Sequence, residues 1–490
     1  MYQCLEGLEP KRVFEIFGEL CQIPHGSKNE KAISDYIYHF CENLGLEVYQ
    51  DQAFNLIIKK PATPGYEEAP VTILQAHMDM VCEKNADKVH DFKKDPVPVM
   101  RDGDRIYADG TTLGADDATG VAFAMCVLES KDIPHPRLEV VLTTDEEAGM
   151  SGIKALDFSK LEGRVIINLD CSDEGIVVGC AGTVSIRMDL NLKKEVIPGN
   201  WEKKVVQVRG LKGGHSGLDM TKERGNANVI LARILSDLQE NCQVRICSIN
   251  GGLQTNAICR EADGEVAFPV QRTEEIQERL KEWNQILKKE FKISDPEVTV
   301  KLENGREPDQ WSCFTEEGTE RLLGLLLNID CGVIADNLET PGVPETSGNM
   351  GVIVTEGSRV ILRPLYRSCY NSKKKYVTDK NRRLAKQFGA EFTVEANSPE
   401  WEYKADSPLS ALIQKTFEKR YGKKLVVEVS HGGNECGTFF QHFPDADIVC
   451  TGTQIIGAHT PNESVLVSIV QKEWEMLCLT LKGMLEYGKV

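Results

Sequence analysis

The sequence predicts an α/β fold into which a second, α+β domain is inserted. Over about the first 180 residues, short continuous apolar runs alternate with amphipathic helical patterns, which is typical of a sheet with several parallel strands. From about residue 183 the predicted strands instead alternate apolar and polar residues, as in sheets with one solvated face. The first pattern then returns. We therefore expect one domain formed by residues 1–183 and 397–490, interrupted by an inserted domain at 184–396.

The first part of the chain predicts helices and buried strands in turn. The expected helices lie at 14–20, 32–41 and 118–128, and the expected buried strands lie at 71–74, 138–142 and 164–169. The third helix is indicated by Val121, Met125 and Leu128, which recur at helical spacing and form one apolar face. Strands that are apolar at every position indicate a sheet covered on both faces.

The inserted part and the C-terminal part differ in the kind of strand that their sequences predict. In the inserted part, strands are expected at 184–190 and 204–208 and helices at 227–238 and 274–289. In the C-terminal part, a helix is expected at 408–420, a buried strand at 446–450 and a final helix at 467–485. The return of a buried strand between two helices indicates that the last part completes the first domain.

Composition excludes several classes of function. The 490 residues include 57 Lys and Arg against 75 Asp and Glu, a net charge of −18, so neither a nucleic acid nor an anionic membrane is an expected partner. The basic residues between 373 and 383 are expected to form a solvated helix face. No signal sequence or membrane-spanning run is evident, and the 16 cysteines include no CxxC pair. These features predict a cytoplasmic protein with reduced thiols.

Acidic residues and histidines follow the predicted buried strands. Because ligands collect beyond the carboxyl ends of parallel strands, these side chains are expected to converge. So many carboxylates would repel one another unless cations neutralise them, and two histidines favour zinc or a similar metal over magnesium. The residues are His77, Asp79, Asp116, Asp117, Asp145, Glu146, Glu147, Asp170 and His459.

These segments resemble the motifs of the M20 metallopeptidases, and the resemblance extends over essentially the whole chain. In order, they are HMD (77–79), GADD (114–117), TTDEEAG (143–149), NLD (168–170) and GAHTPNE (457–463). The segments GLKGGHSG (210–217), NAI (256–258), ETSGNMG (345–351) and SHGGNECG (430–437) are most similar to the aminoacyl-histidine dipeptidase branch of that family. The resemblance implies a catalytic domain with a mixed sheet and helices on both faces, and an inserted lid domain.

The resemblance also implies a centre of two divalent metal ions, with zinc expected and manganese or cobalt as alternatives. Asp116 would bridge the two ions and would be joined to Asp117 by a cis peptide bond. The remaining ligands would be His77 and Asp170 for one ion, and Glu147 and His459 for the other.

Three further residues are candidates for catalysis. Asp79 lies two residues after His77, so its carboxylate can reach the free N–H of that imidazole and fix its tautomer. Glu146 is the candidate general base, since in an extended segment it would point away from its neighbour Glu147 and toward the attacking water. By resemblance, His215 in the glycine-rich KGGHSG segment would stabilise the oxyanion of the tetrahedral intermediate.

Candidate substrate-binding residues follow from the same resemblance. Asn256 and Arg363 would hold the C-terminal side of the substrate, with the Arg363 guanidinium binding the terminal carboxylate as a fork. Glu435 is a candidate for the free α-amino group. His431 is expected to be structural rather than a sixth metal ligand.

These inferences predict a cytoplasmic di-metal dipeptidase acting on unblocked dipeptides, including Xaa-His dipeptides such as carnosine. Two alternatives stay open: an amidohydrolase that removes an acyl group from an amino acid, and a non-catalytic metal-binding scaffold. The presence of Asp79 and Glu146, which a scaffold would not need, favours an enzyme. The inserted domain is long enough to supply His215 within one chain, and a homodimer stays open.

Overall fold

The computed structural model describes residues 2–171, 175–305 and 312–489. The chain forms two compact units. Unit 1 contains Met1–Gly179, Tyr403–Val429 and Asn434–Val490, and unit 2 contains Cys180–Glu402 and Ser430–Gly433. Unit 1 is therefore built from both ends of the chain, and unit 2 is almost entirely the intervening segment.

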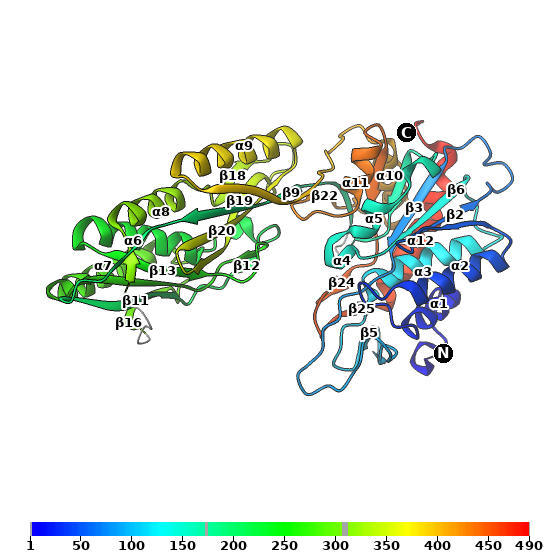
Figure 1. Cartoon of the computed structure of the whole chain (residues 1–490). Coiled ribbons are helices and arrows are strands. Elements are labelled where there is room, and N and C mark those ends of the chain that lie inside the picture. The colour runs from blue at the N-terminus through cyan, green and yellow to red at the C-terminus, as the bar shows by residue number, and fades with distance from the viewer. Residues whose placement is uncertain (1, 172–174, 306–311, 490) are drawn as a thin grey trace. The chain divides into compact units, whose positions relative to one another are not determined.

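Unit 1 is organised around an eight-stranded mixed sheet (Figure 1). Its strands, in spatial order, are β1 (Glu47–Gln50), β2 (Leu56–Lys60), β6 (Leu138–Thr143), β3 (Thr72–His77), β7 (Val165–Asn168), β23 (Asp447–Cys450), β8 (Ile176–Cys180) and β22 (Val427–Ser430). β3 is parallel to both β6 and β7, and β7 is parallel to β23. These four strands are buried at every residue, as the continuous apolar runs predicted.

Helices cover both faces of this sheet (Figure 1). They are α1 (Lys11–Cys21), α2 (Lys31–Asn43), α3 (Ala115–Glu129), α4 (Glu146–Gly149), α5 (Ser151–Ala155), α10 (Pro408–Tyr421), α11 (Cys436–His442) and α12 (Val467–Gly483). α3 packs against β3 and α1, while α10 packs against β23 and α12. A second small sheet contains β24 (Ile455–Ile456), β25 (Ser464–Leu466), β5 (Arg105–Ala108) and β4 (Val99–Asp102).

Unit 2 is an α+β structure whose larger sheet has nine strands with antiparallel pairing. In spatial order they are β16 (Thr299–Asn304), β11 (Trp201–Arg209), β15 (Ala262–Pro269), β13 (Arg245–Gly251), β19 (Pro344–Glu356), β20 (Arg359–Ser368), β9 (Gly182–Asn191) and β21 (Glu391–Ser398), with β18 (Gly332–Asp336) beside β19. The helices are α6 (Ala227–Cys242), α7 (Thr273–Glu290), α8 (Glu316–Asn328) and α9 (Asn371–Phe388). Short strands β10 (Lys194–Val196) and β17 (Ser312–Phe314) pair separately.

Every helix and strand predicted from the sequence is present, but some bounds differ. β3 continues to His77, so the first candidate ligand is the last residue of that strand. α3 begins three residues earlier than predicted, and Asp116 and Asp117 have non-helical backbone angles at its start. Both differences concern the edge of the sheet where the candidate site lies, because polar residues there mask the apolar pattern used to predict element ends.

The basic stretch on α9 is not uniformly solvated, which corrects the sequence-based expectation. Lys374 is 4% exposed, and its Nζ lies 2.6 Å from the Glu400 carboxylate and donates to the Ser398 carbonyl at 2.7 Å. The neighbouring Lys375 is exposed and pairs with Asp379. A run of like charges on a helix thus contains one buried, paired member.

The sixteen cysteines all lie among the described residues, and none of them forms a disulfide bond. Across the described ranges, no helix combines the length and the apolar character that crossing a bilayer requires.

Candidate metal centre

Five side chains predicted as metal ligands meet beyond the carboxyl ends of β3, β6 and β7 in unit 1. His77, Asp116 and Asp170 offer ligand atoms that all lie within 4.8 Å of one another. Asp116, Glu147 and His459 form a second such group, so Asp116 belongs to both. His77 ends β3, Asp170 and His459 follow β7 and β24, and Asp116 and Glu147 lie in the first turns of α3 and α4. The ends of these elements bring together positions spread over 383 residues of sequence.

The two carboxylate oxygens of Asp116 face different histidines. Oδ1 lies 3.2 Å from His77 Nε2, and Oδ2 lies 3.5 Å from His459 Nε2. Asp170 Oδ1 approaches His77 Nε2 at 3.7 Å, and Glu147 Oε1 approaches His459 Nε2 at 2.9 Å. This is the arrangement that a carboxylate shared by two ions requires.

The backbone at Asp116 and Asp117 is irregular, at the start of α3. The Asp116–Asp117 peptide bond is cis, as the family resemblance implied. Asp117 lies behind the site, where its carboxylate accepts from the backbone N–H groups of His77 at 3.3 Å and Gly120 at 3.1 Å. Neighbouring acidic residues therefore have different roles: one faces the site, and the other holds its backbone.

Asp79 supports both His77 and the loop after β6. Its carboxylate accepts from Ser27 Oγ at 2.7 Å and from the backbone N–H groups of Glu146 at 2.9 Å and Glu147 at 3.2 Å. The closest partner of His77 Nδ1 is the main-chain carbonyl of Asp79 at 3.1 Å, while the Asp79 carboxylate lies at 3.6 Å. The sequence indicated the contact with His77 but not the two bonds that hold the glutamates.

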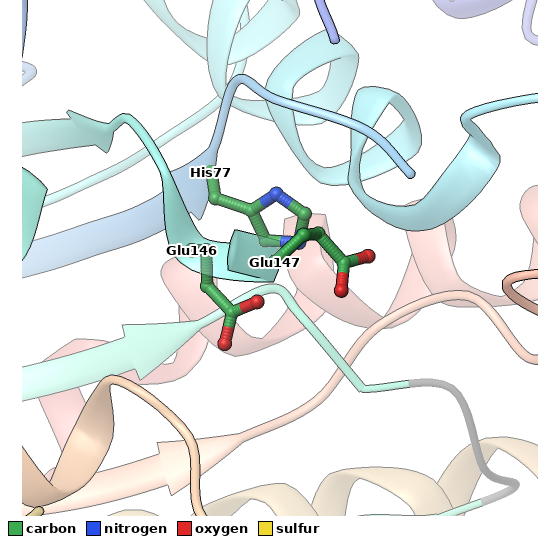
Figure 2. Close-up of side chains that lie close together, drawn as sticks. All are labelled: His77, Glu146 and Glu147. Atoms are coloured by element: carbon green, nitrogen blue, oxygen red, sulfur yellow. The ribbon is translucent and has the colours of Figure 1, made fainter. Parts of the chain in front are cut away.

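Glu146 and Glu147 direct their carboxyl groups to different places beside His77 (Figure 2). The two glutamates and His77 also offer atoms within 4.8 Å of one another. The expectation of an extended segment is wrong: the residues begin the short helix α4, after Asp145 at φ 56°. Consecutive residues of a helix point about 100° apart around its axis, which separates the two side chains.

The centre brings several buried carboxyl groups close to one another. Burial raises the pKa of Glu146 well above its ordinary value, and the nearby carboxylates of Asp170, Glu435 and Glu147 raise it further. Burial likewise raises the pKa of Asp170 to about 7. Hydrogen bonding to Asp116 and Glu147 raises the pKa of His459 to about 10. Carboxylates this crowded ionise together only when cations compensate them.

A divalent metal fits this set of donors. Glu147 Oε1 is buried and has no hydrogen-bond partner among the described residues, although His459 Nε2 is close to it. The donors are imidazole nitrogens and carboxylate oxygens, the combination that zinc and similar metals accept. The His77 side chain is 1% exposed and that of His459 is 52% exposed, so the group is accessible to solvent from the His459 side.

The predicted residues of the inserted segment are only partly brought together. His215 lies on β12 (Gly214–His215), which pairs with β14 (Ala257–Ile258), and the Ser216 N–H donates to the Asn256 carbonyl at 2.8 Å. Arg363 on β20 instead pairs with Glu395 on β21 at 2.7 Å, and its side chain is 40% exposed. His215 and Asn256 are therefore neighbours, whereas Arg363 is engaged with a carboxylate of its own sheet.

Arg367, which sequence reasoning missed, lies beside His215. It is 5% exposed, and its Nη2 is 3.4 Å from His215 Nε2. Its other partners, also at 3.4 Å, are Ser216 Oγ and the His431 carbonyl, and no carboxylate of the described residues lies within ion-pair distance. The only signal in the sequence was a further arginine near the end of a largely apolar strand, four residues after Arg363.

Glu435 and His431 have mainly internal partners. Glu435 is fully buried in unit 1 and accepts from Gln75 Nε2 at 2.5 Å and Thr143 Oγ1 at 2.7 Å, while its Oε1 has no hydrogen-bond partner in the described structure. Burial raises its pKa to about 8. His431, in unit 2, bonds Ser347 Oγ through Nε2 at 2.7 Å. None of the candidate metal groups found among the described residues includes His431.

The chain is similar to known proteins over almost its whole length. Residues 73–483 match the model of peptidase family M20/M25/M40. The cytosol non-specific dipeptidase of Escherichia coli K12 is 36% identical over 479 residues, which cover 98% of each chain.

Two solved structures are also similar. The aminoacylhistidine dipeptidase of Vibrio alginolyticus superposes with a TM-score of 0.89 at 36% identity, covering 98% of this chain and 97% of that one. The aminopeptidase PepT of Bacillus cereus superposes with a TM-score of 0.56 at 19% identity, covering 98% and 99%, which supports the fold alone.

Proposed function

This chain belongs to peptidase family M20/M25/M40, and from that premise we propose that it is a metallo-dipeptidase that hydrolyses the peptide bond of unblocked dipeptides. The observation that supports this most directly is Asp116, whose two oxygens face two separate sets of ligands. The names of the two 36% identical relatives support dipeptides as the substrate class and Xaa-His among them. We also propose that it acts in the cytoplasm, since the Escherichia coli relative is named a cytosol enzyme.

The proposed ligands are shared between two ions. His77 and Asp170 would hold one ion, Glu147 and His459 would hold the other, and Asp116 would bind both. Zinc is the proposed metal, with manganese and cobalt as alternatives. When bound, such ions acidify a water molecule and polarise the scissile carbonyl.

Within this frame, Glu146 is the proposed general base. It would accept the proton of the attacking water at its carboxylate and deliver it to the leaving amine nitrogen. Its backbone is fixed by the Asp79 carboxylate, so Asp79 would orient both the base and His77. A general base needs this kind of fixed position within hydrogen-bond reach of the proton that it removes.

For the substrate's terminal carboxylate we propose Arg367 in place of Arg363. A buried guanidinium with no carboxylate partner within the described structure can form a bidentate, charge-assisted pair with a ligand carboxylate. Arg363 would first have to leave Glu395. His215 adjoins Arg367, and Asn256 directly precedes β14, which pairs with the strand of His215. They keep their proposed roles in binding the oxyanion and the C-terminal side.

The test is a substrate panel on protein of known metal content. Free dipeptides should be cleaved rapidly, while N-acetylated amino acids and dipeptide amides should be poor substrates. Preferential cleavage of N-acyl amino acids would instead establish the amidohydrolase alternative, and no turnover of either class by the two-metal protein would favour the scaffold. Sedimentation velocity on the same sample tests the homodimer.

A further inference from the structure

Glu463 is a buried carboxylate whose two oxygens bind four consecutive backbone N–H groups. Oε2 accepts from Leu113 at 2.9 Å and from Gly114 at 3.2 Å. Oε1 accepts from Ala115 at 2.8 Å and from Asp116 at 3.4 Å. The residue is 2% exposed. A set of N–H groups at the start of a helix is a ready anion site, and here a side chain of the same chain occupies it.

The four donors are the segment that carries Asp116 into the centre. Gly114 has φ +71°, and a Cβ at this position would lie 2.8 Å from the Met80 sulfur, so the turn needs glycine. The four bonds to Glu463 hold the backbone that bears the Asp116 side chain. The position of the shared carboxylate thus depends on an acceptor located 347 residues away in the sequence.

Glu463 also closes the loop that contains His459. Its own N–H donates to the Thr460 carbonyl at 3.0 Å, and Thr460 Oγ1 donates to the Gly457 carbonyl at 2.7 Å. The next residues form β25, which pairs with β5. One side chain therefore connects the loop of His459 to the segment of Asp116, and these two residues with Glu147 make up one of the two ligand groups.

We propose that Glu463 is a positioning residue that sets the spacing of Asp116 and His459 and thereby the affinity of the centre for the ion held with Glu147. The inference rests on the two-ion centre of the proposed function. Glu463 cannot act on substrate directly, because both oxygens already accept two N–H groups each and the residue is buried. The other ion also shares Asp116, but it keeps His77 on β3 and Asp170 after β7. Neither of these residues contacts Glu463 in the described structure, so the affinity for this ion should change less.

The decisive variant is Glu463→Gln, which keeps the size but places an NH₂ group against two backbone N–H donors. Metal-free protein is titrated with Zn²⁺, with bound metal counted by elemental analysis and thermal unfolding recorded for the metal-free form. We expect wild type to bind two ions, and Glu463→Gln to bind the weaker one about 10–100-fold less tightly. Excess Zn²⁺ should then restore turnover, which a purely structural defect would not allow.

Glu139→Gln is the matched control. Glu139 is another fully buried carboxylate of unit 1, and it accepts from the backbone N–H groups of Glu162 at 2.9 Å and Gly163 at 3.0 Å, next to the first residue of β6. The Glu139→Gln variant should be less stable than wild type but should still bind both ions. If Glu463→Gln fails to fold, Glu463→Asp, whose shorter side chain cannot span all four donors, should show a smaller loss of the same ion.

Three results would overturn the proposal: two ions bound at wild-type affinity in the Glu463 variants, equal weakening of both ions, or the same loss in Glu139→Gln. Failure of the proposed function is recognised separately, since wild type itself would then bind fewer than two ions or remain active without metal.

Discussion

Replacing Arg367 tests whether the second unit binds the substrate's terminal carboxylate. Arg367→Met keeps an unbranched apolar stem but removes the charge and all donors. The hydrogen bonds that Arg367 makes to Ser216, His431 and His215 are all 3.4 Å long and therefore weak, so most of its donor capacity is available to a ligand. Arg367→Lys keeps the charge but loses the planar fork and should be only partly active.

The magnitude follows from the bonds that would be lost. Two charge-assisted hydrogen bonds contribute about 1.5 kcal/mol each at the lower end of their range, or about 3 kcal/mol together. At about 1.4 kcal/mol for each tenfold change, kcat/KM for a dipeptide should fall roughly 10²-fold in Arg367→Met. Wild type should discriminate against the C-terminal amide of the same dipeptide by a similar factor, and Arg367→Met should lose that discrimination.

The assay is kcat/KM for a dipeptide and its amide, measured for wild type, Arg367→Met and Arg363→Met. Arg363 lies on the same strand but is 40% exposed and paired with Glu395, so its replacement should change kcat/KM less than about threefold. Because Arg367 is a buried cation without a carboxylate partner in the described structure, Arg367→Met should not lower the unfolding midpoint. Equal losses for the dipeptide and the amide, or an equal loss in Arg363→Met, would refute the assignment.

Three further outcomes are expected. Chelation should abolish turnover, and added Zn²⁺ should restore it. Full activity in metal-free protein would contradict a metal-dependent mechanism. Glu147→Ala should lose one ion by elemental analysis, whereas Glu146→Gln should keep both yet turn over roughly 10²–10⁴-fold more slowly, and the reverse pattern would exchange their roles. Burial lowers the pKa of His431 from 6.5 to about 3, so its stabilising contribution is complete above pH 6.5 and is lost as the pH falls toward 3. Below pH 6.5, wild type should therefore lose about 1.4 kcal/mol of unfolding free energy per pH unit relative to His431→Gln, and parallel pH profiles would contradict this.

The sequence by itself determined the architecture of unit 1 and the residue types of its candidate metal centre. Buried parallel strands require apolar residues at every position, so β3, β6 and β7 are visible as continuous runs. The polar residues that interrupt those runs mark the sheet edge where ligands collect. Both signals are local in sequence, and His77 and Glu147 could therefore be predicted without coordinates.

Only the tertiary structure decided which charged side chains are already engaged by partners of this chain and which keep hydrogen-bond donors for a ligand. Arg363 and Arg367 lie four residues apart on β20 and look equivalent in sequence, yet one is paired with Glu395 and the other is buried beside His215. Lys374 is buried within a run of exposed charges, and Glu463 meets backbone N–H groups nearly 350 positions away. The physical reason is that the energy of a charge depends on its burial and on partners brought close by the fold, and neither follows from local sequence.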